Sequence, residues 1–118
     1  MTTMTGAELI SAERARQVSQ EGWTAEHDDC HTNGELARAA VCYASPVPVY
    51  VTEYRCGGYA FADPWPWTDD KSDKRQWWDG SPWTAASYSK NERIGLLVKA
   101  GALIAAEIDR LQRVKDGK

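Results

Sequence analysis

The chain has 118 residues and a net charge of −3, which allows one domain with a modest core and excludes an enzyme built from two domains. Hydrophobic residues make up 42% of the chain and charged residues 26%, proportions that exclude a disordered protein. The acidic chain lacks the positive charge that duplex nucleic-acid binding needs, so we expect no duplex nucleic acid as a partner. It also lacks a run of ~20 apolar residues and a signal-peptide pattern, so we expect a cytoplasmic protein that does not bind a membrane.

The three cysteines are Cys30, Cys42 and Cys56. They are odd in number and show no CxxC spacing, which predicts free thiols rather than a disulfide framework.

A first helix is predicted from Thr5 to about Gln20. Thr5 and Glu8 have the spacing of a capping box, in which each side chain satisfies a free backbone N–H of the first turn. Gly22 favours the end of this helix because glycine adopts left-handed backbone at little cost. Its apolar side is predicted to be Leu9, Ile10, Ala15 and Val18.

A second, shorter helix is predicted after another capping box at Thr32 and Glu35, and Pro46 ends it. Small apolar residues at helical spacing form its buried side: Leu36, Ala39, Ala40 and Tyr43. We expect this narrow side to pack closely, against the last helix.

Residues 47–52 alternate valines with other side chains, and Gly57-Gly58 separates them from residues 59–61. This pattern predicts a β-hairpin. Since a lone hairpin is marginally stable, it should pack on the helices or extend a sheet across a subunit boundary.

Residues 63–90 show no sustained period and are predicted to be a long ordered loop held by its tryptophans. Five of the six tryptophans lie in it: Trp65, Trp67, Trp77, Trp78 and Trp83.

The strongest predicted element is a helix from a third capping box, Ser89 to Glu92, to about Val114. An apolar stripe runs along it and is formed by Ile94, Leu97, Val98, Gly101, Ile104, Ala105, Ile108 and Leu111, widened by Leu96 and Leu103. Gly101 costs ~1 kcal/mol within a helix, so we expect close approach by another backbone there. Together these elements predict an α+β fold, with N-terminal and C-terminal helices packed around a small antiparallel hairpin and a long Trp-rich loop.

The polar cluster of residues 26–31 allows two interpretations. His27, Asp28 and His31 are residue types that bind transition metals, and the histidines would share one face if the segment were helical. The cluster nevertheless lies between Gly22 and a capping box, so we favour a loop whose side chains cap and solvate backbone. No metal is therefore expected, and a histidine general base lacks a defined partner.

An aromatic platform with polar and cationic neighbours is the feature that best predicts a function, because it can stack a base and neutralise a phosphate. The candidate ligand-binding residues are Trp65, Trp67, Trp77, Trp78, Asn91, Arg93 and Lys99. The alternative is that the tryptophans cover the core or seal a dimer. Surplus aromatics and the hairpin also predict a homo-oligomer, a dimer or larger.

Five blocks of the sequence resemble a family of small proteins of bacteriophages and prophages: ERARQ at 13–17, GWTAEHDDCHTNGELARAAVCYA at 22–44, WPW at 65–67, WW at 77–78 and LVKAGALIAAEIDRL at 97–111. We identify this pattern with the first-type Thoeris anti-defence sponges, which bind cyclic ADP-ribose signals without cleaving them. The resemblance implies a phage-encoded protein of the host cytoplasm, an α+β unit assembled as dimers or higher oligomers. It implies no cofactor and no catalysis, with a cyclic nucleotide as the bound small molecule.

The same resemblance implies adenine stacking on Trp67 or Trp78, and polar and phosphate contacts from Asn91 and Arg93. The long stretch 68–76 and the irregular stretch 80–90 put these assignments in doubt.

Two alternatives to a sponge remain. The first block is also similar to the first helix of MazG-like pyrophosphohydrolases, for which Glu13, Glu107 and Asp109 would supply magnesium ligands. The paired ExxE and ExxD motifs of that family are not present, and solvated carboxylates are the simpler expectation. The other alternative is a non-catalytic phage accessory protein whose tryptophans bind a host protein.

Overall fold

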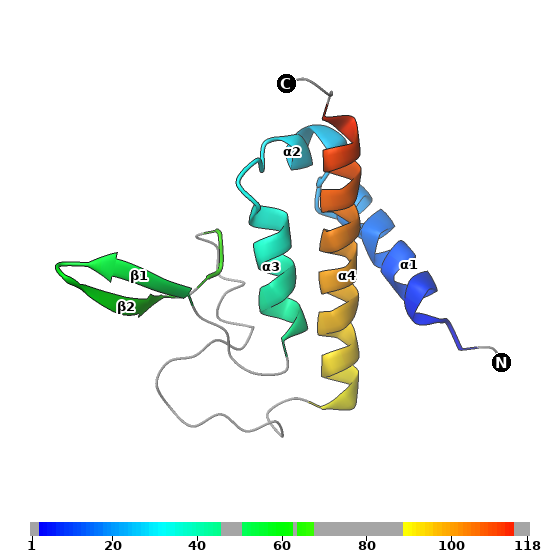
Figure 1. Cartoon of the computed structure of the whole chain (residues 1–118). Helices are drawn as coiled ribbons and strands as arrows, with labels where there is room; N and C mark the ends of the chain where they lie inside the picture. The colour runs from blue at the N-terminus through cyan, green and yellow to red at the C-terminus, as the bar shows by residue number, and fades with distance from the viewer. Residues whose placement is uncertain (1–2, 46–50, 63, 68–88, 115–118) are drawn as a thin grey trace.

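The computed structural model describes residues 3–45, 51–62, 64–67 and 89–114. In chain order the elements are α1 (Gly6–Gln20), α2 (Ala25–Asp29), α3 (Glu35–Ala44), β1 (Val51–Arg55), β2 (Gly58–Ala62) and α4 (Lys90–Arg113), as Figure 1 shows. The predicted α+β class with N-terminal and C-terminal helices is confirmed. None of the described helices is long and apolar enough to cross a membrane.

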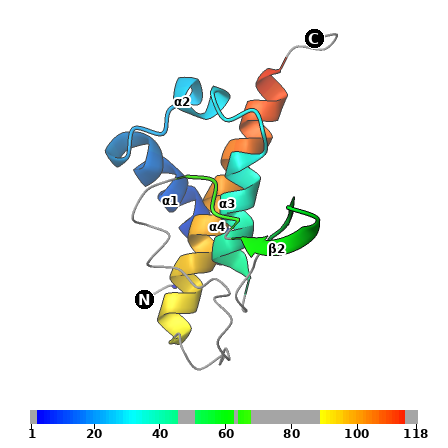
Figure 2. The ribbon, with the colours of Figure 1, turned by 90° about the vertical axis from the view of Figure 1, so that its left-hand side faces the viewer.

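The long helix α4 lies at the centre of the helical part. Helices α3 and α1 pack on two sides of it, and α2 contacts its C-terminal half (Figures 1 and 2). The hairpin extends away from the helices, beyond α3 (Figure 1). The fold is therefore a helical unit with a projecting two-stranded arm.

Two of the three predicted capping boxes are present. At the start of α1, the backbone N–H of Thr5 donates to Glu8 Oε1 at 2.7 Å, and the N–H of Glu8 donates to Thr5 Oγ1 at 3.2 Å. Ser89 and Glu92 make the same reciprocal pair at the start of α4, at 2.9 and 3.1 Å. Because their carboxylates accept these bonds, the pKa values of both glutamates are lowered.

The third capping box, predicted at Thr32, is wrong. Gly34 is the N-cap of α3, with a left-handed φ of 78° and no side-chain cap bond. Glu35 instead accepts a bond from the Asn33 N–H at 2.7 Å. The turn through Gly34 uses backbone that glycine adopts without strain, and this replaces the threonine cap.

The core lies between α3 and α4, as the small side chains of the second helix predict. Most of its members are alanine, leucine or cysteine, and two are aromatic: Leu36, Ala39, Ala40, Cys42, Tyr43, Trp65, Ala100, Leu103 and Ala106. Alanine on both helices lets their backbones approach closely. Arg93 of α4 reinforces this interface, because its guanidinium donates to the carbonyls of Ala44 and Ser45 at 3.1 and 3.3 Å and so satisfies the end of α3.

Most of the apolar stripe predicted along α4 is not its buried face, and Leu103 is its one buried member. The buried residues of α4 are Ala100, Ala102, Leu103, Ala106 and Arg110, of which Ala100, Leu103 and Ala106 belong to the core. Five members of the stripe, Ile94, Leu97, Ile104, Ile108 and Leu111, are 40–55% exposed. The contact with α3 selects the alanine face because small residues pack more closely there than isoleucine and leucine would.

The apolar side predicted for α1 is also wrong in part. Ala15 and Val18 are exposed, Leu9 and Ile10 are half-buried, and the buried residue of the helix is Gln17. The reason is that this end of α1 faces a polar pocket rather than the core.

Gly101 is a point of close contact between α1 and α4. A Cβ atom at this position would lie 2.5 Å from Ile10 Cδ1 and 2.8 Å from Ile10 Cγ1. The neighbour is thus a side chain and not, as predicted, another backbone.

The predicted hairpin is present, and its first strand extends to Arg55, beyond the predicted end at residue 52. The strands pair antiparallel, with Val51 opposite Ala62 and Tyr54 opposite Tyr59, and Cys56 and Gly57 form the turn at positive φ. Residues 46–50, where the sequence pattern began, lie outside the described residues. In the described part of the chain the strands pack on each other rather than on the helices.

All three cysteines are free, as predicted. Cys42 is buried in the core, whereas Cys30 and Cys56 are exposed.

Candidate functional site

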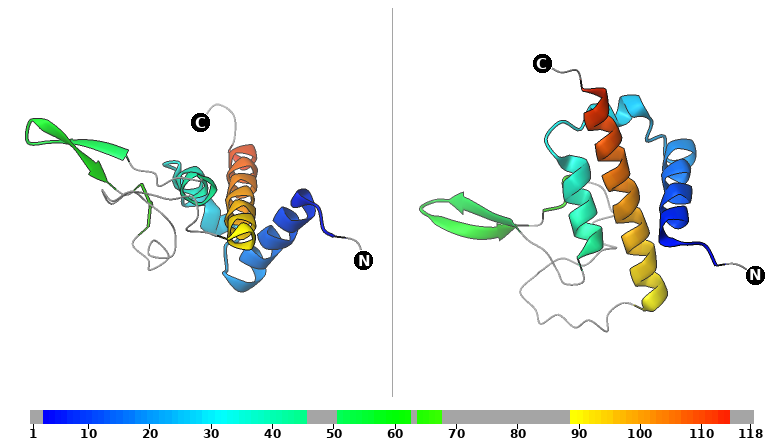
Figure 3. Two further views of the ribbon diagram at one scale, coloured as in Figure 1. Left: turned by 90° about the horizontal axis from the view of Figure 1, so that it is seen from below. Right: turned by 45° about the vertical axis from the view of Figure 1, so that its right-hand side comes forward.

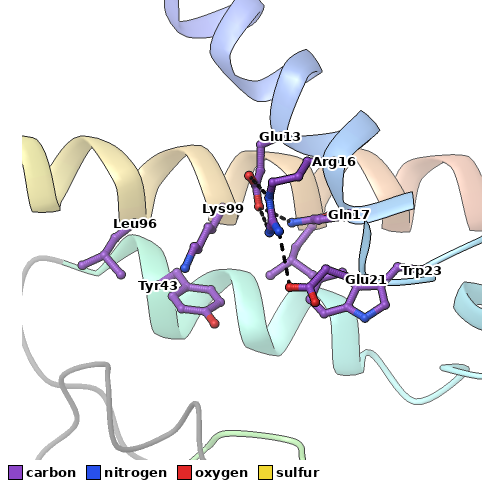
Figure 4. A pocket seen from close by; sticks show the side chains of 9 residues that line it. Glu13, Arg16, Gln17, Glu21, Trp23, Tyr43, Leu96 and Lys99 are labelled. Atoms are coloured by element: carbon purple, nitrogen blue, oxygen red, sulfur yellow. Dashed lines mark hydrogen bonds and ion pairs between the residues drawn. The ribbon is translucent and has the colours of Figure 1, made fainter. Parts of the chain in front are cut away.

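A pocket of about 300 Å³ opens between α1, α3 and the segment that follows α1, with α4 beneath it (Figure 4). It is lined by Glu13, Arg16, Gln17, Glu21, Trp23, Tyr43, Leu96, Lys99 and Leu103. We call it the α1–α3 pocket. Its volume is at the small end of the range for small-molecule sites, roughly 300–1,000 Å³.

One wall of the pocket is a charged network on α1. The Arg16 guanidinium binds Glu13 through two parallel bonds of 2.8 Å and reaches Glu21 Oε2 at 3.5 Å. The bonds from Arg16 hold the pKa of Glu13 below its ordinary value, against the opposing effect of burial, and the pKa of Arg16 is raised in turn. Glu13 is therefore a fixed anion and a weak base.

Gln17 is the buried polar side chain of α1 that lines the pocket. Only 2% of it is exposed, and its Nε2 donates to Glu13 Oε2 at 3.2 Å. Its Oε1 is buried and has no hydrogen-bond partner. Leaving a buried acceptor unsatisfied costs about 1–3 kcal/mol, so this oxygen favours a ligand that donates a hydrogen bond.

The opposite wall combines aromatic rings with a cation. Lys99 Nζ lies 5.8 Å from the centroid of the Tyr43 ring, within the range of a cation–π contact. Trp23 lines the pocket from the segment that follows α1 (Figure 4). These side chains can stack a flat ring and neutralise an anion.

A second hollow of about 170 Å³ shares Trp23 with the pocket and is otherwise lined by His27, His31 and Trp67. The Trp23 and His27 rings are parallel within 5°, with centroids 6.1 Å apart, and the His31 and Trp67 rings lie 5.4 Å apart. His31 Nε2 and Trp67 Nε1 are both buried without a hydrogen-bond partner. We call this the aromatic hollow.

The loop predicted for residues 26–31 is wrong for residues 26–29, which belong to α2, whereas Cys30 and His31 follow the helix. Thr24 caps it, accepting a bond from the His27 N–H at 3.4 Å. His27 and His31 lie on one side of this turn, with ring centroids 4.9 Å apart. The signal that could have identified the helix is the Thr24 N-cap three residues before His27.

Two acidic residues of this region, Asp28 and Asp29, bind arginines. Asp28 pairs with Arg14, and Asp29 accepts three bonds from Arg113, the shortest 2.7 Å long. Elsewhere, Glu107 pairs with Arg110 on α4. Among the described residues there is no group of three potential metal ligands.

The tryptophans predicted to bind ligand lie in different places. Trp67 lines the aromatic hollow, and Trp65 is 8% exposed and packs edge-on against both Tyr43 and Trp67, at 5.3 Å. Trp77 and Trp78 lie outside the described residues. Trp65 thus connects the core to the hollow.

The three polar candidates of α4 are also separated. Lys99 lines the α1–α3 pocket, Arg93 binds the carbonyls at the end of α3, and Asn91 is exposed in the first turn of α4.

Sequence reasoning missed most of the pocket, including Arg16, Gln17, Trp23 and Tyr43. The available signal was the spacing of Glu13, Arg16 and Gln17, which places three polar side chains on one face of a helix whose buried side was expected to be apolar.

Comparison of the chain with protein-family models, with curated proteins and with solved structures gives no match.

Proposed function

We propose that this protein binds and retains a small nucleotide of the adenine class, such as a cyclic ADP-ribose isomer, without cleaving it. The observation that carries the proposal is a pocket that contains two aromatic rings, Lys99 and Gln17, whose buried Oε1 has no hydrogen-bond partner.

Each part of the pocket suits one part of such a ligand. The exocyclic amino group of adenine is a donor that Gln17 Oε1 can accept from, while Tyr43 and Trp23 supply ring faces for stacking. Lys99 makes no ion pair with any described carboxylate, so its ammonium group is available to a phosphate. A pocket of about 300 Å³ has room for a base and its sugar rather than for a whole cyclic dinucleotide.

Retention is favoured over turnover by the state of the pocket's carboxylates. A general base needs a pKa near neutrality, whereas Arg16 lowers the pKa of Glu13. Arg16 also reaches Glu21. The resemblance to the Thoeris sponges implies the same outcome.

The test is to measure binding of cyclic ADP-ribose isomers and cyclic dinucleotides by calorimetry, then to heat the complex and identify the released compound by chromatography. We expect intact ligand to be recovered. Recovery of a cleaved product would contradict retention, and no binding of any of these compounds would contradict the nucleotide class and favour a protein partner.

A matched pair of lysines tests the site itself. Lys99→Ala should weaken binding by about tenfold or more, since it removes a charge-assisted contact. Lys90→Ala removes the same charge from the first residue of α4, outside the pocket, and should leave binding unchanged. Equal effects of the two variants would show that only the general charge of the protein matters.

A further inference from the structure

The aromatic hollow is built from four rings that come from separate parts of the chain. Trp23 precedes α2, His27 lies in it, His31 follows it, and Trp67 belongs to the described segment 64–67. Both views of Figure 3 show α2 between α1 and α3, and it contacts α4. The volume of the hollow, about 170 Å³, slightly exceeds the ~150 Å³ of a cavity that holds benzene. The hollow therefore has room for one six-membered ring.

Two polar atoms of the residues that line the hollow are unsatisfied. Among the described residues, His31 Nε2 and Trp67 Nε1 are buried and have no hydrogen-bond partner. The two rings that carry these atoms have their centroids 5.4 Å apart, close enough for one small molecule to contact both. A buried polar atom without a partner is unfavourable, so this pair favours a ligand that forms hydrogen bonds.

The two atoms differ in what they can bind. An indole Nε1 is only a donor. His31 Nδ1 lies 3.8 Å from Glu35 Oε2, and a carboxylate favours the proton on the nitrogen that faces it. In the uncharged imidazole, Nε2 then has a lone pair and accepts a hydrogen bond. A ligand that satisfies both atoms must accept from Trp67 and donate to His31.

The surroundings of the hollow favour an uncharged ligand. His27 Nδ1 lies 3.3 Å from Asp28 Oδ1, so a carboxylate lies beside each of the two histidines. Among the described residues, neither lysine nor arginine lines the hollow. An anionic ligand would lose its hydration there without gaining a cationic partner.

We propose that the aromatic hollow binds an uncharged planar ring that carries a carbonyl group and an N–H, the chemistry of a cyclic amide. The carbonyl accepts from Trp67 Nε1, and the N–H donates to His31 Nε2. The Trp23 and His27 rings, parallel within 5°, supply aromatic surface for the rest of the ligand. The inference is independent of the nucleotide proposed for the α1–α3 pocket.

The first experiment is a titration of the whole chain with 2-pyridone at about pH 8, where imidazole is uncharged, followed by NMR of the indole N–H groups. The signal of Trp67 is the one that disappears in Trp67→Phe. We expect 2-pyridone to shift this signal with a Kd of about millimolar, as is typical of so small a ligand.

Two further compounds test the chemistry of the ligand. N-methyl-2-pyridone keeps the ring and the carbonyl but has no N–H, so it should bind about tenfold more weakly than 2-pyridone. Benzoate is a planar anion of similar size and should leave the Trp67 signal in place.

A matched pair of variants tests the Trp67 donor. Trp67→Phe keeps an aromatic ring but removes the donor, and it should weaken 2-pyridone binding about tenfold, measured on the signals of the compound itself. Tyr59→Phe removes a polar hydrogen from a hairpin ring that is 76% exposed and lies outside the hollow, and it should leave binding unchanged.

His31→Phe tests the acceptor separately. It should weaken binding of 2-pyridone but not of N-methyl-2-pyridone, which makes no bond to this residue. Circular dichroism checks that each variant keeps its helices, and His31→Phe tests the site even where Trp67→Phe does not fold.

Three results would overturn the proposal. A Trp67 signal that 2-pyridone does not shift would mean that the hollow holds water only. Equal affinities for the two pyridones would exclude the bond to His31. Benzoate that binds more tightly than 2-pyridone would make the hollow an anion site.

Discussion

Arg14 of α1 and Asp28 of α2 form an ion pair in which Nη2 lies 2.6 Å from Oδ2, and the Asp28 side chain is only 1% exposed. Arg14 also donates to the carbonyl of Trp23 at 3.3 Å. A single guanidinium therefore fixes both α2 and the tryptophan that lines the α1–α3 pocket.

Replacing Arg14 by methionine should destabilise the protein strongly. The variant keeps most of the side-chain length but leaves a buried carboxylate without its cation, a change that costs about 3–5 kcal/mol. Arg113→Met breaks the exposed pair with Asp29 and should cost less than about 1 kcal/mol. Urea unfolding of both variants measures the free energies, and similar losses would mean that burial of Asp28 is unimportant.

Gly101→Ala should destabilise the helical unit, although alanine favours helix by ~1 kcal/mol. The added methyl group would overlap Ile10, and overpacking costs typically about 1–3 kcal/mol. Ile10→Val removes the atom that lies 2.5 Å from the new Cβ, so the double variant should recover part of the loss. A double-mutant cycle in urea measures the coupling, and strictly additive effects would rule out this contact as the cause.

Gln17→Leu should separate stability from binding. The leucine removes the unsatisfied oxygen, so the free energy of unfolding should stay level or rise, even though the bond to Glu13 is lost. Nucleotide binding should weaken by about tenfold, because the ligand loses its acceptor. Thermal melts with and without ligand give both quantities, and unchanged binding would remove Gln17 from the site.

The protein should lose stability in acid. The pKa of Glu13 is held below its ordinary value of 4.5 by the bonds from Arg16, and that of Glu35 by backbone N–H groups. The folded state therefore binds fewer protons than the unfolded state, so this stability is fully present above pH 4.5 and is lost as the pH falls through the lowered values.

Urea midpoints from about pH 6 down to about pH 3 measure this loss. Glu13→Gln should flatten the decline, because its amide does not titrate. An unchanged slope in this variant would assign the acid sensitivity to other carboxylates.

The helix starts at Thr5 and Ser89 could be predicted from the sequence because a capping box is local: four consecutive residues contain all its partners. The buried face of α4 could not be predicted from the sequence. The helix offers both a row of isoleucines and leucines and a row of alanines, and only the alanine face of α3 decides between them.

The candidate site was hard to predict for the same reason. Lys99 was identified from its charge, yet the pocket around it depends on α1 crossing α4 where Ile10 meets Gly101. No local sequence pattern predicts that Gln17 is buried or that its Oε1 has no hydrogen-bond partner. The aromatic cluster at His27 and His31 likewise depends on Trp67, which is thirty-six residues after His31 in the chain.

The projecting hairpin should open locally at a lower free energy than the helical unit. The Tyr54 and Tyr59 rings meet edge-on across the strands, with centroids 5.3 Å apart, but remain 65% and 76% exposed. A two-stranded sheet without further packing is marginally stable. In native-state hydrogen exchange, the amides of β1 and β2 should therefore exchange through local opening, well before those of α4. Nucleotide binding should slow exchange in α1, α3 and α4 and leave the hairpin amides at their original rates. This result would mean that the chain unfolds as two cooperative units rather than one.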